Sequence, residues 1–346
     1  MTLASNAKTI NLVGATLVRR TVLRIAPLEV NSRFEELLPD DGKMRLGEID
    51  PAWSESYAVS NAVADIASLW GRVGAADPGR YGQALKQARA AAEISGSGAF
   101  LQVETRTPVQ PRLFNYHGVG GTEDVGVVIS DPLSQIGREA HDQATSSALG
   151  NLMIALPAAW SVFTQQPYRW IYLDAGRVQI YFLGVAIGQA VLGTGGKFVE
   201  EIETKYRKLL ARFDPDIRRP LAMLKASAID AKNELEEFLF LWTALEFLVK
   251  GIGGKHRAAF NELAAQLSTV LAHRRFNKKK RGLRFKFLVS VYVFDIGSVI
   301  DFLERFDPLQ KFRNAAFHEA SIADLKAYSE RTRQLLLDLL RLHTGV

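Results

Sequence analysis

The sequence of 346 residues predicts an α+β fold in which a mixed α/β region precedes an all-helical bundle. Two observations support this class. In residues 1–199, β-branched runs alternate with segments in which apolar residues recur at helical spacing. From Pro215 onward, the apolar residues keep helical spacing and no strand pattern intervenes. We therefore expect two domains, one over residues 1–199 and one over residues 200–346.

The N-terminal region is expected to mix both kinds of element. Thr9–Ile25 is rich in Ile, Leu, Val and Thr, which predicts one or two strands. Further strands are expected at residues 100–103 and 125–129, and a strand pair at 170–173 and 179–183. Helical spacing predicts helices over residues 51–73, 78–94 and 132–149.

The apolar spacing of the C-terminal region predicts five helices, apart from the segment that begins at Asp307 and is considered below. The first runs from Arg218 to Val249 and should stop at Gly251, with Lys250 placed favourably in its last turn. The others are expected at residues 255–273, 283–294, 298–306 and 321–343. Together they can enclose a core.

Composition excludes several classes of protein. The chain has no cysteine, which excludes disulfides, thiol catalysis, zinc fingers and cysteine-ligated iron–sulfur clusters. Its apolar runs are interrupted by charges, as Leu239–Val249 is by Glu246, and none reaches the length of a membrane span. The first ten residues lack the pattern of a secretory signal. We expect a cytoplasmic protein with no membrane association.

Positive charge is concentrated in the C-terminal region. The net charge is +6, yet residues 1–199 hold 17 basic and 18 acidic side chains, whereas residues 200–346 hold 26 and 19. Eight of the 13 residues from Arg274 to Lys286 are Lys or Arg, among them Lys278, Lys279, Lys280, Arg281 and Arg284. Such a run favours a nucleic-acid partner. The alternative is a solvated loop that keeps the protein soluble.

No function follows from the motifs of the N-terminal region. Residues 193–197 (GTGGK) resemble a phosphate-binding loop, but Val191 replaces its first Gly and Phe198 replaces the Ser or Thr that would hold magnesium. His117 and His141 have no histidine or acidic partner at metal-ligand spacing. We interpret them as ordinary polar residues and expect no metal site.

A short C-terminal segment carries the pattern that points to chemistry. Asp307-Pro308-Leu309-Gln310 has the residues of a helix start, with Asp as the N-cap. On a helical wheel, Arg313 falls within the apolar side, which a merely solubilising charge would avoid. Asn314 and His318 are four residues apart on the adjoining face. An arginine beside an amide and an imidazole suits the handling of phosphate.

This segment resembles the signature of the HEPN family, in which Arg, a polar residue, three further residues and His follow one another. It reads Arg313-Asn314-Ala315-Ala316-Phe317-His318. Phe238–Lys250 (FLFLWTALEFLVK) resembles the first core helix of the Apea-like branch, with Glu246 at the place of a recurrent acidic residue. The resemblance covers about residues 215–343.

The resemblance implies a metal-independent endoribonuclease that needs no cofactor, often a bacterial toxin or an effector of antiviral defence. His318 would be the general acid/base, Arg313 would hold the scissile phosphate, and Asn314 would orient the imidazole or donate to phosphate. Glu246 would be a partner of Arg313. The family's sites are typically completed across a two-fold homodimer, and the basic residues 278–281 and 284 would bind RNA.

Two other interpretations remain open. The domain could be a catalytically silent module that binds nucleic acid or a nucleotide. It could also be purely structural, with Arg313 paired to Glu246 or another buried acid. With the nuclease interpretation, the N-terminal region, which lacks a site of its own, is expected to act as a sensor or specificity module. An antitoxin or a trigger ligand is a further expected partner of a toxic nuclease.

Overall fold

The computed structural model divides the chain into two units. One comprises Met1–Thr145 and Val162–Phe198, and the other comprises Ser146–Ser161 and Val199–Val346. The stretch 146–161, which we had grouped with the N-terminal region, therefore belongs to the second unit. The structure describes residues 10–11, 14–26, 28–31, 33–38, 42–55, 58–59, 82–83, 86–87, 99–109, 112–117, 123–128, 131–157, 163–174, 179–182, 196–212, 214–256, 258, 282–316 and 324–346.

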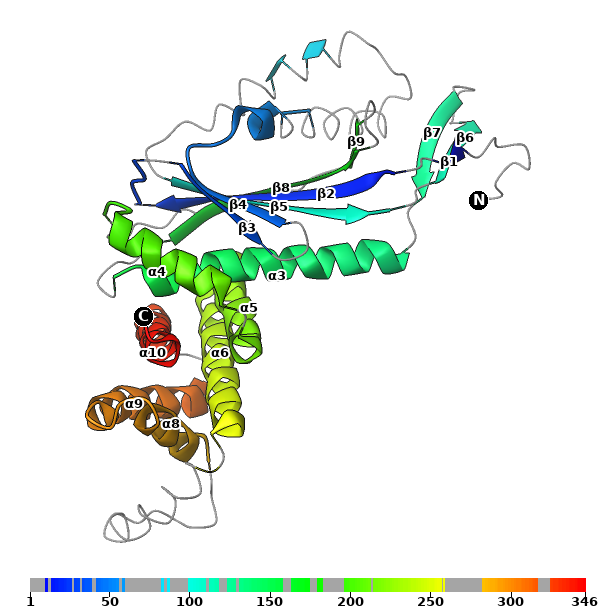
Figure 1. The fold of residues 1–346 in the computed structure, drawn as a ribbon. Helices are drawn as coiled ribbons and strands as arrows, with labels where there is room; N and C mark the ends of the chain where they lie inside the picture. The colour runs from blue at the N-terminus through cyan, green and yellow to red at the C-terminus, as the bar shows by residue number, and fades with distance from the viewer. Residues whose placement is uncertain are drawn as a thin grey trace. The chain divides into compact units, whose positions relative to one another are not determined.

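The first unit is built on antiparallel strands (Figure 1). Within the described residues, six strands form one sheet in the order β3-β4-β5-β2-β8-β9. Their bounds are β2 Thr16–Ala26, β3 Phe34–Leu38, β4 Gly42–Gly47, β5 Ala99–Pro108, β8 Phe163–Asp174 and β9 Gln179–Phe182. A second sheet has the order β1-β6-β7, with bounds Ile10–Asn11, Arg112–His117 and Glu123–Val128.

The predicted strands of the first unit are confirmed, and the structure adds β6 and one hairpin. The run 9–25 forms β1 and β2, and the pair near residue 175 forms β8 and β9, with Ile171 opposite Phe182. The β3–β4 hairpin was not predicted. Of the expected helices, residues 51–55, 58–59, 82–83 and 86–87 are helical, and the rest of 51–73 and 78–94 lies outside the described residues.

The centre of the large sheet is buried on both faces. β2 pairs along almost its whole length with β5 on one side and with β8 on the other. Side chains of opposite faces, such as Leu23 and Val22, are fully buried. A strand that is apolar on both faces must therefore have covering elements above and below it.

The long helix α3 spans Asp131–Ala155, and its part up to Thr145, which belongs to this unit, contacts one face of the sheet. A Cβ atom at Gly137 would lie 2.6 Å from Thr107 Oγ1, so the glycine permits close approach of α3 to β5. The buried ring of His141 lies between two hydroxyls, with Thr21 at 2.8 Å and Thr105 at 2.8 Å. His141 is thus a satisfied polar residue of this interface.

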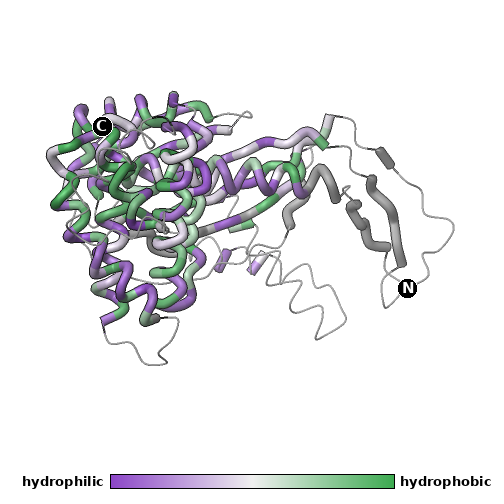
Figure 2. Tube along the Cα trace, turned by 90° about the horizontal axis from the view of Figure 1, so that it is seen from below, coloured by the Kyte–Doolittle hydropathy of each residue, from purple (hydrophilic) through white to green (hydrophobic). Residues whose placement is uncertain are grey.

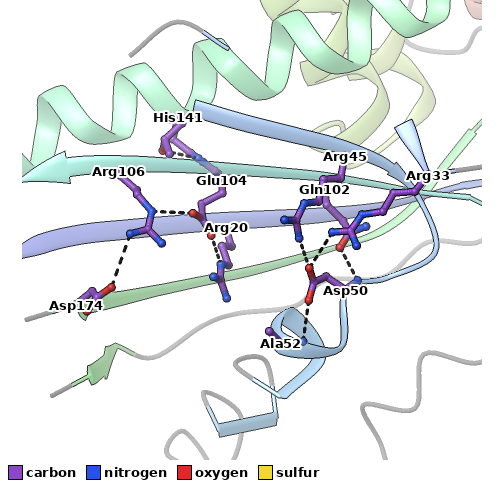
Figure 3. Close-up of polar contacts among 11 residues, drawn as sticks. Arg20, Arg33, Arg45, Asp50, Ala52, Gln102, Glu104, Arg106, His141 and Asp174 are labelled. Atoms are coloured by element: carbon purple, nitrogen blue, oxygen red, sulfur yellow. Dashed lines mark hydrogen bonds and ion pairs between the residues drawn. The ribbon is translucent and has the colours of Figure 1, made fainter. Parts of the chain in front are cut away.

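The opposite face carries buried charges (Figure 3). Glu104 accepts hydrogen bonds from Arg20 Nε at 2.6 Å and from Arg106 Nε at 2.9 Å. The Arg20 guanidinium also lies over the rings of Trp53 and Tyr172, at 4.8 Å and 5.1 Å from their centroids. Burial disfavours the ionised carboxylate, but the two arginines outweigh it and hold the pKa of Glu104 below its ordinary value.

A second ion cluster ties residues 50–52 to the same sheet (Figure 3). The Asp50 carboxylate pairs with Arg45 and Arg33 and accepts the N–H of Ala52. The side chain of Gln102 accepts the N–H of Asp50 at 2.9 Å. These contacts hold the turn that places Trp53 over Arg20.

The second unit is mostly helical, and apolar and polar stretches alternate along its helices (Figure 2). It contains the end of α3 and the helices α4 Glu200–Ala211, α5 Pro215–Ile229, α6 Glu234–Lys255, α8 Leu283–Tyr292, α9 Val299–Ala316 and α10 Leu325–Thr344. The chain is therefore mixed α/β, with an antiparallel sheet first and a helical region after it.

The prediction of one helix over residues 218–249 is wrong. Two helices, α5 and α6, take its place, and α6 continues past Gly251 to Lys255. The break has a local cause, because the Asn233 side chain accepts the N–H of Glu236 and the Glu236 carboxylate accepts the N–H of Lys232. This reciprocal capping starts a new helix at Glu234. The helix expected over residues 255–273 lies almost wholly outside the described residues.

The end of α3 is fixed within the helical unit by polar contacts. The buried Tyr206 hydroxyl of α4 donates to the Ala148 carbonyl at 2.8 Å. The Arg341 guanidinium of α10 donates to the carbonyls of Ile154 and Leu156, at 3.1 Å and 2.8 Å. A cation is thus placed at the negative end of the α3 dipole.

The charged sheet face gives a prediction about stability. Glu104→Gln removes the carboxylate charge that pairs with the buried Arg20, so we expect the free energy of unfolding in urea to fall by about 3 kcal/mol at pH 7. In the wild type this contribution is full above the ordinary pKa of the carboxyl group and is lost as the pH falls through its lowered folded-state pKa.

The matched control is Glu35→Gln. Its carboxylate also pairs with arginines but is half exposed, and we expect a loss below about 1 kcal/mol. Equal losses for the two variants would contradict a special role of the Glu104 pair.

Candidate functional site

Arg313 and Asn314 lie in the last turn of α9. This helix begins at Val299 and continues through Pro308, so the predicted helix start at Asp307 is wrong. The Asp307 carboxylate instead receives Arg284 of α8 in a two-pronged contact, with both N···O distances 2.6 Å. Pro308 has no N–H to donate within the helix, but its fixed φ is compatible with helical backbone.

The apolar side predicted by the helical wheel agrees with the burial of the described side chains of α9. Leu309 and Phe312 are buried, Arg313 is half-buried and Asn314 is exposed. The Arg313 side chain keeps 37% of its surface exposed. The side chain is therefore partly packed and partly reached by solvent, and its Nε atom is buried.

Aromatic contacts fix α6 against α9. Phe238 of α6 meets Phe312 edge-on at 5.0 Å, and Trp242 of α6 stacks on Phe306 at 5.6 Å. Phe287 of α8 stacks on Phe306 from another side at 4.2 Å. These rigid rings set which faces of the two helices meet.

The same packing brings Glu246 of α6 to Arg313. Glu246 Oε1 lies 3.9 Å from Arg313 Nη2, and Arg313 Nη1 donates to Asn314 Oδ1 at 3.3 Å. On α6, Trp242 Nε1 donates to Glu246 Oε1 at 2.9 Å, and Lys250 Nζ lies 3.5 Å from Oε2. We call these five residues the α6–α9 polar cluster.

The α6–α9 polar cluster offers donors of the kind that bind an oxyanion. Arg313 presents a forked, permanently charged donor, Lys250 a mobile ammonium and Asn314 an amide. Glu246 partly neutralises the two cations. The separation of 3.9 Å between Glu246 and Arg313 exceeds hydrogen-bond length, so this pair is a loose ion pair.

Of the remaining predicted site residues, the structure describes Arg284 alone. His318 and the basic residues Lys278, Lys279, Lys280 and Arg281 lie outside the described residues. Arg284 is described, and its guanidinium is engaged by Asp307. The hydrogen bond to Asp307 is the main cause that raises the pKa of Arg284 above its ordinary value.

A buried carboxylate–imidazole pair was missed by the sequence analysis. His343 Nε2 lies 3.1 Å from Asp214 Oδ2, and both side chains are almost fully buried. Asp214 also caps α5 by accepting the N–H of Asp216 at 3.0 Å. The Asp-Pro start of α5 is a sequence signal for the cap, but no spacing rule links residue 214 to residue 343.

The electrostatics of this pair favour a neutral imidazole. Burial lowers the pKa of His343 below its ordinary value, and the nearby cations Lys255 and Arg212 act in the same direction, while Asp214 opposes them. Burial alone would raise the pKa of Asp214, but the Asp216 N–H, His343 and Lys255 outweigh it and lower that pKa. Charging His343 would also place an N–H at Nδ1, which has no acceptor among the described residues.

Nowhere in the described part of the chain do three or more His, Asp or Glu side chains gather as metal ligands would. None of the helices described there combines the length and apolar character of a membrane span.

Comparison of the chain with models of protein families, with curated proteins and with solved structures found no match.

The Asp214–His343 pair predicts how stability depends on pH. Because the folded-state pKa of His343 is lowered, the unfolded chain binds more protons as the pH falls below about 6.5. We therefore expect the melting temperature to fall between pH 7.5 and pH 5.5, and we expect His343→Gln to reduce this slope.

His256→Gln serves as the control. His343 and His256 both meet the ring of Phe294 edge-on, but it is His343 that pairs with Asp214. That variant should keep the wild-type slope. An unchanged slope in His343→Gln would show that the pair does not govern this pH dependence.

Proposed function

We propose that this protein is a metal-independent endoribonuclease of the HEPN type. The observation that carries the proposal is the partly exposed side chain of Arg313, which the α6–α9 packing places beside Glu246 and Asn314. The segment that resembles the family's first core helix is α6, and the segment that resembles its Arg–His motif includes the end of α9. Two segments distant in the sequence thus meet at the residues that the resemblance marks.

The chemistry assigned to these residues is an internal transfer. The His318 imidazole takes the proton of the ribose 2′-hydroxyl, and the 2′-oxygen attacks the adjacent phosphorus. The bond from phosphorus to the 5′-oxygen breaks, and the leaving oxygen receives a proton. Arg313 stabilises the charge that develops on the phosphate oxygens, and Asn314 donates to the phosphate or orients the imidazole. The products are a 2′,3′-cyclic phosphate and a 5′-hydroxyl.

The proposal also assigns partners. RNA would be gathered by the basic residues 278–281, whose charge acts on the phosphate backbone irrespective of sequence. A homodimer of the helical unit would bring two copies of Arg313 and His318 to one groove. The first unit would act as a sensor or specificity module, and an antitoxin or a trigger ligand would restrain the toxic activity of a defence effector in the cytoplasm.

A second candidate function has its own support. The structural interpretation expects Arg313 to pair with Glu246, and these side chains do lie 3.9 Å apart. A carboxylate at this place lowers the positive potential that a phosphate would meet. This favours the purely structural interpretation, in which the ion pair braces α6 against α9 and Arg313 does not meet a phosphate.

Substitution at the motif tests the nuclease directly. Arg313→Ala and His318→Ala should each lower the rate of cleavage of a single-stranded RNA in EDTA by at least about 100-fold, because each removes a group used in the transition state. The measurement is the initial rate, with analysis of the product ends.

The matched control is Arg218→Ala, which removes an exposed arginine from α5 of the same unit. It should leave the rate unchanged, and all three variants should keep the wild-type melting temperature. Full activity of Arg313→Ala would overturn the proposal.

The silent-module alternative predicts a different pattern. Replacing Lys278, Lys279, Lys280 and Arg281 by Gln should weaken RNA binding and reduce its dependence on salt under both functions. Only the nuclease predicts that Arg313→Ala abolishes cleavage while most of the RNA affinity remains. A wild-type chain that binds RNA tightly and never cuts it would favour the silent module.

A further inference from the structure

The indole of Trp242 is placed to control Arg313 through Glu246. Trp242 is 3% exposed, and its Nε1–H donates to Glu246 Oε1 at 2.9 Å. An indole N–H can only donate, so a buried indole requires an acceptor. Trp242 and Glu246 are four residues apart on α6, so they lie on one face of that helix.

The oxygen that accepts the indole N–H is also the one nearest Arg313. Glu246 Oε1 lies 3.9 Å from Arg313 Nη2, whereas the other oxygen, Oε2, faces Lys250 at 3.5 Å. The Lys250 side chain is 55% exposed, so its contact is weak and adaptable. The short bond to the buried indole is therefore the contact that fixes the carboxylate.

Trp242 is itself fixed by the helix that carries Arg313. Its ring stacks on Phe306 of α9 at 5.6 Å and lies 6.2 Å from the ring of Phe238. Phe238 in turn meets Phe312, the residue directly before Arg313. The indole ring thus packs against α9, while the indole N–H fixes the Glu246 carboxylate.

We propose that Trp242 is a positioning residue of the α6–α9 polar cluster, which holds the Arg313 guanidinium in its working orientation by fixing Glu246 Oε1. The role rests on the proposed nuclease, since Arg313 is the group that would meet the phosphate. Without the indole N–H, Glu246 can turn toward Lys250, and Arg313 loses the anion that directs it. An orientation error of this kind acts on the transition state more than on RNA binding.

The test is Trp242→Phe in the full-length chain. Phenylalanine keeps a ring against Phe306 but has no N–H. In a cleavage assay with a fluorescently labelled single-stranded RNA in EDTA, we expect kcat to fall by about 10-fold or more with KM nearly unchanged. Phe302→Leu, which removes a buried ring of α9 that packs on Phe287 and carries no polar group, should leave kcat within about twofold.

A double-mutant cycle separates positioning from simple packing. In a Glu246→Ala background there is no carboxylate for the indole to position. Adding Trp242→Phe should therefore lower kcat no further. Glu246→Gln keeps an oxygen that accepts the indole N–H, and in this variant Trp242→Phe should still lower kcat. Independent losses from Trp242→Phe and Glu246→Ala would overturn the positioning role.

Failure of the inference and failure of the proposed function give different results. Loss of cleavage in Arg313→Ala with wild-type kcat in Trp242→Phe would overturn only the role of Trp242. Wild-type cleavage in Arg313→Ala would overturn the nuclease and, with it, the positioning of a catalytic Arg313. The NMR signal of the Arg313 Nε–H gives a readout without cleavage. It should shift in Trp242→Phe and not in Phe302→Leu, and an unshifted signal in Trp242→Phe would contradict the proposal.

Discussion

The contact between α6 and α9 is the constraint on which the proposed site depends. Phe238 and Trp242 project from α6 onto Phe312 and Phe306 of α9, and flat rings that stack or meet edge-on allow little rotation of one helix against the other. One turn beyond Trp242, α6 presents Glu246, and directly after Phe312, α9 presents Arg313. The apolar packing that stabilises the helical unit thereby also brings the carboxylate to the guanidinium.

Much of the fold was predictable from local patterns. The apolar run that forms β2, the pairing of β8 with β9, and α10 follow from spacing alone. The helix boundaries were less predictable, because they depend on single polar contacts. The Asn233 cap starts α6 inside a continuous helical pattern. Asp307 lies in a sequence typical of a helix cap, but its carboxylate binds Arg284 of α8 instead. Tertiary contacts decide such positions, and a sequence pattern does not contain them.

The candidate site was predictable in part for the same reason. The wheel placed Arg313 within the packed side of its helix, where the structure finds the side chain half-buried, and Glu246 was named as an acid that could pair with it. Trp242 was not identified, because a tryptophan in an apolar helix is typical of a core and only the structure shows its N–H on the carboxylate. The Asp214–His343 pair joins residues that no local rule connects.

The most direct measurement compares wild-type protein with Arg313→Lys in single-turnover cleavage of one RNA in EDTA, together with the affinity for that RNA. Lysine keeps the positive charge but lacks the planar fork that α6 and α9 orient. The account predicts similar affinity and a rate of cleavage that falls by about 10-fold or more. Equal rates for the two proteins would contradict it, because an oriented guanidinium would then have no part in the reaction.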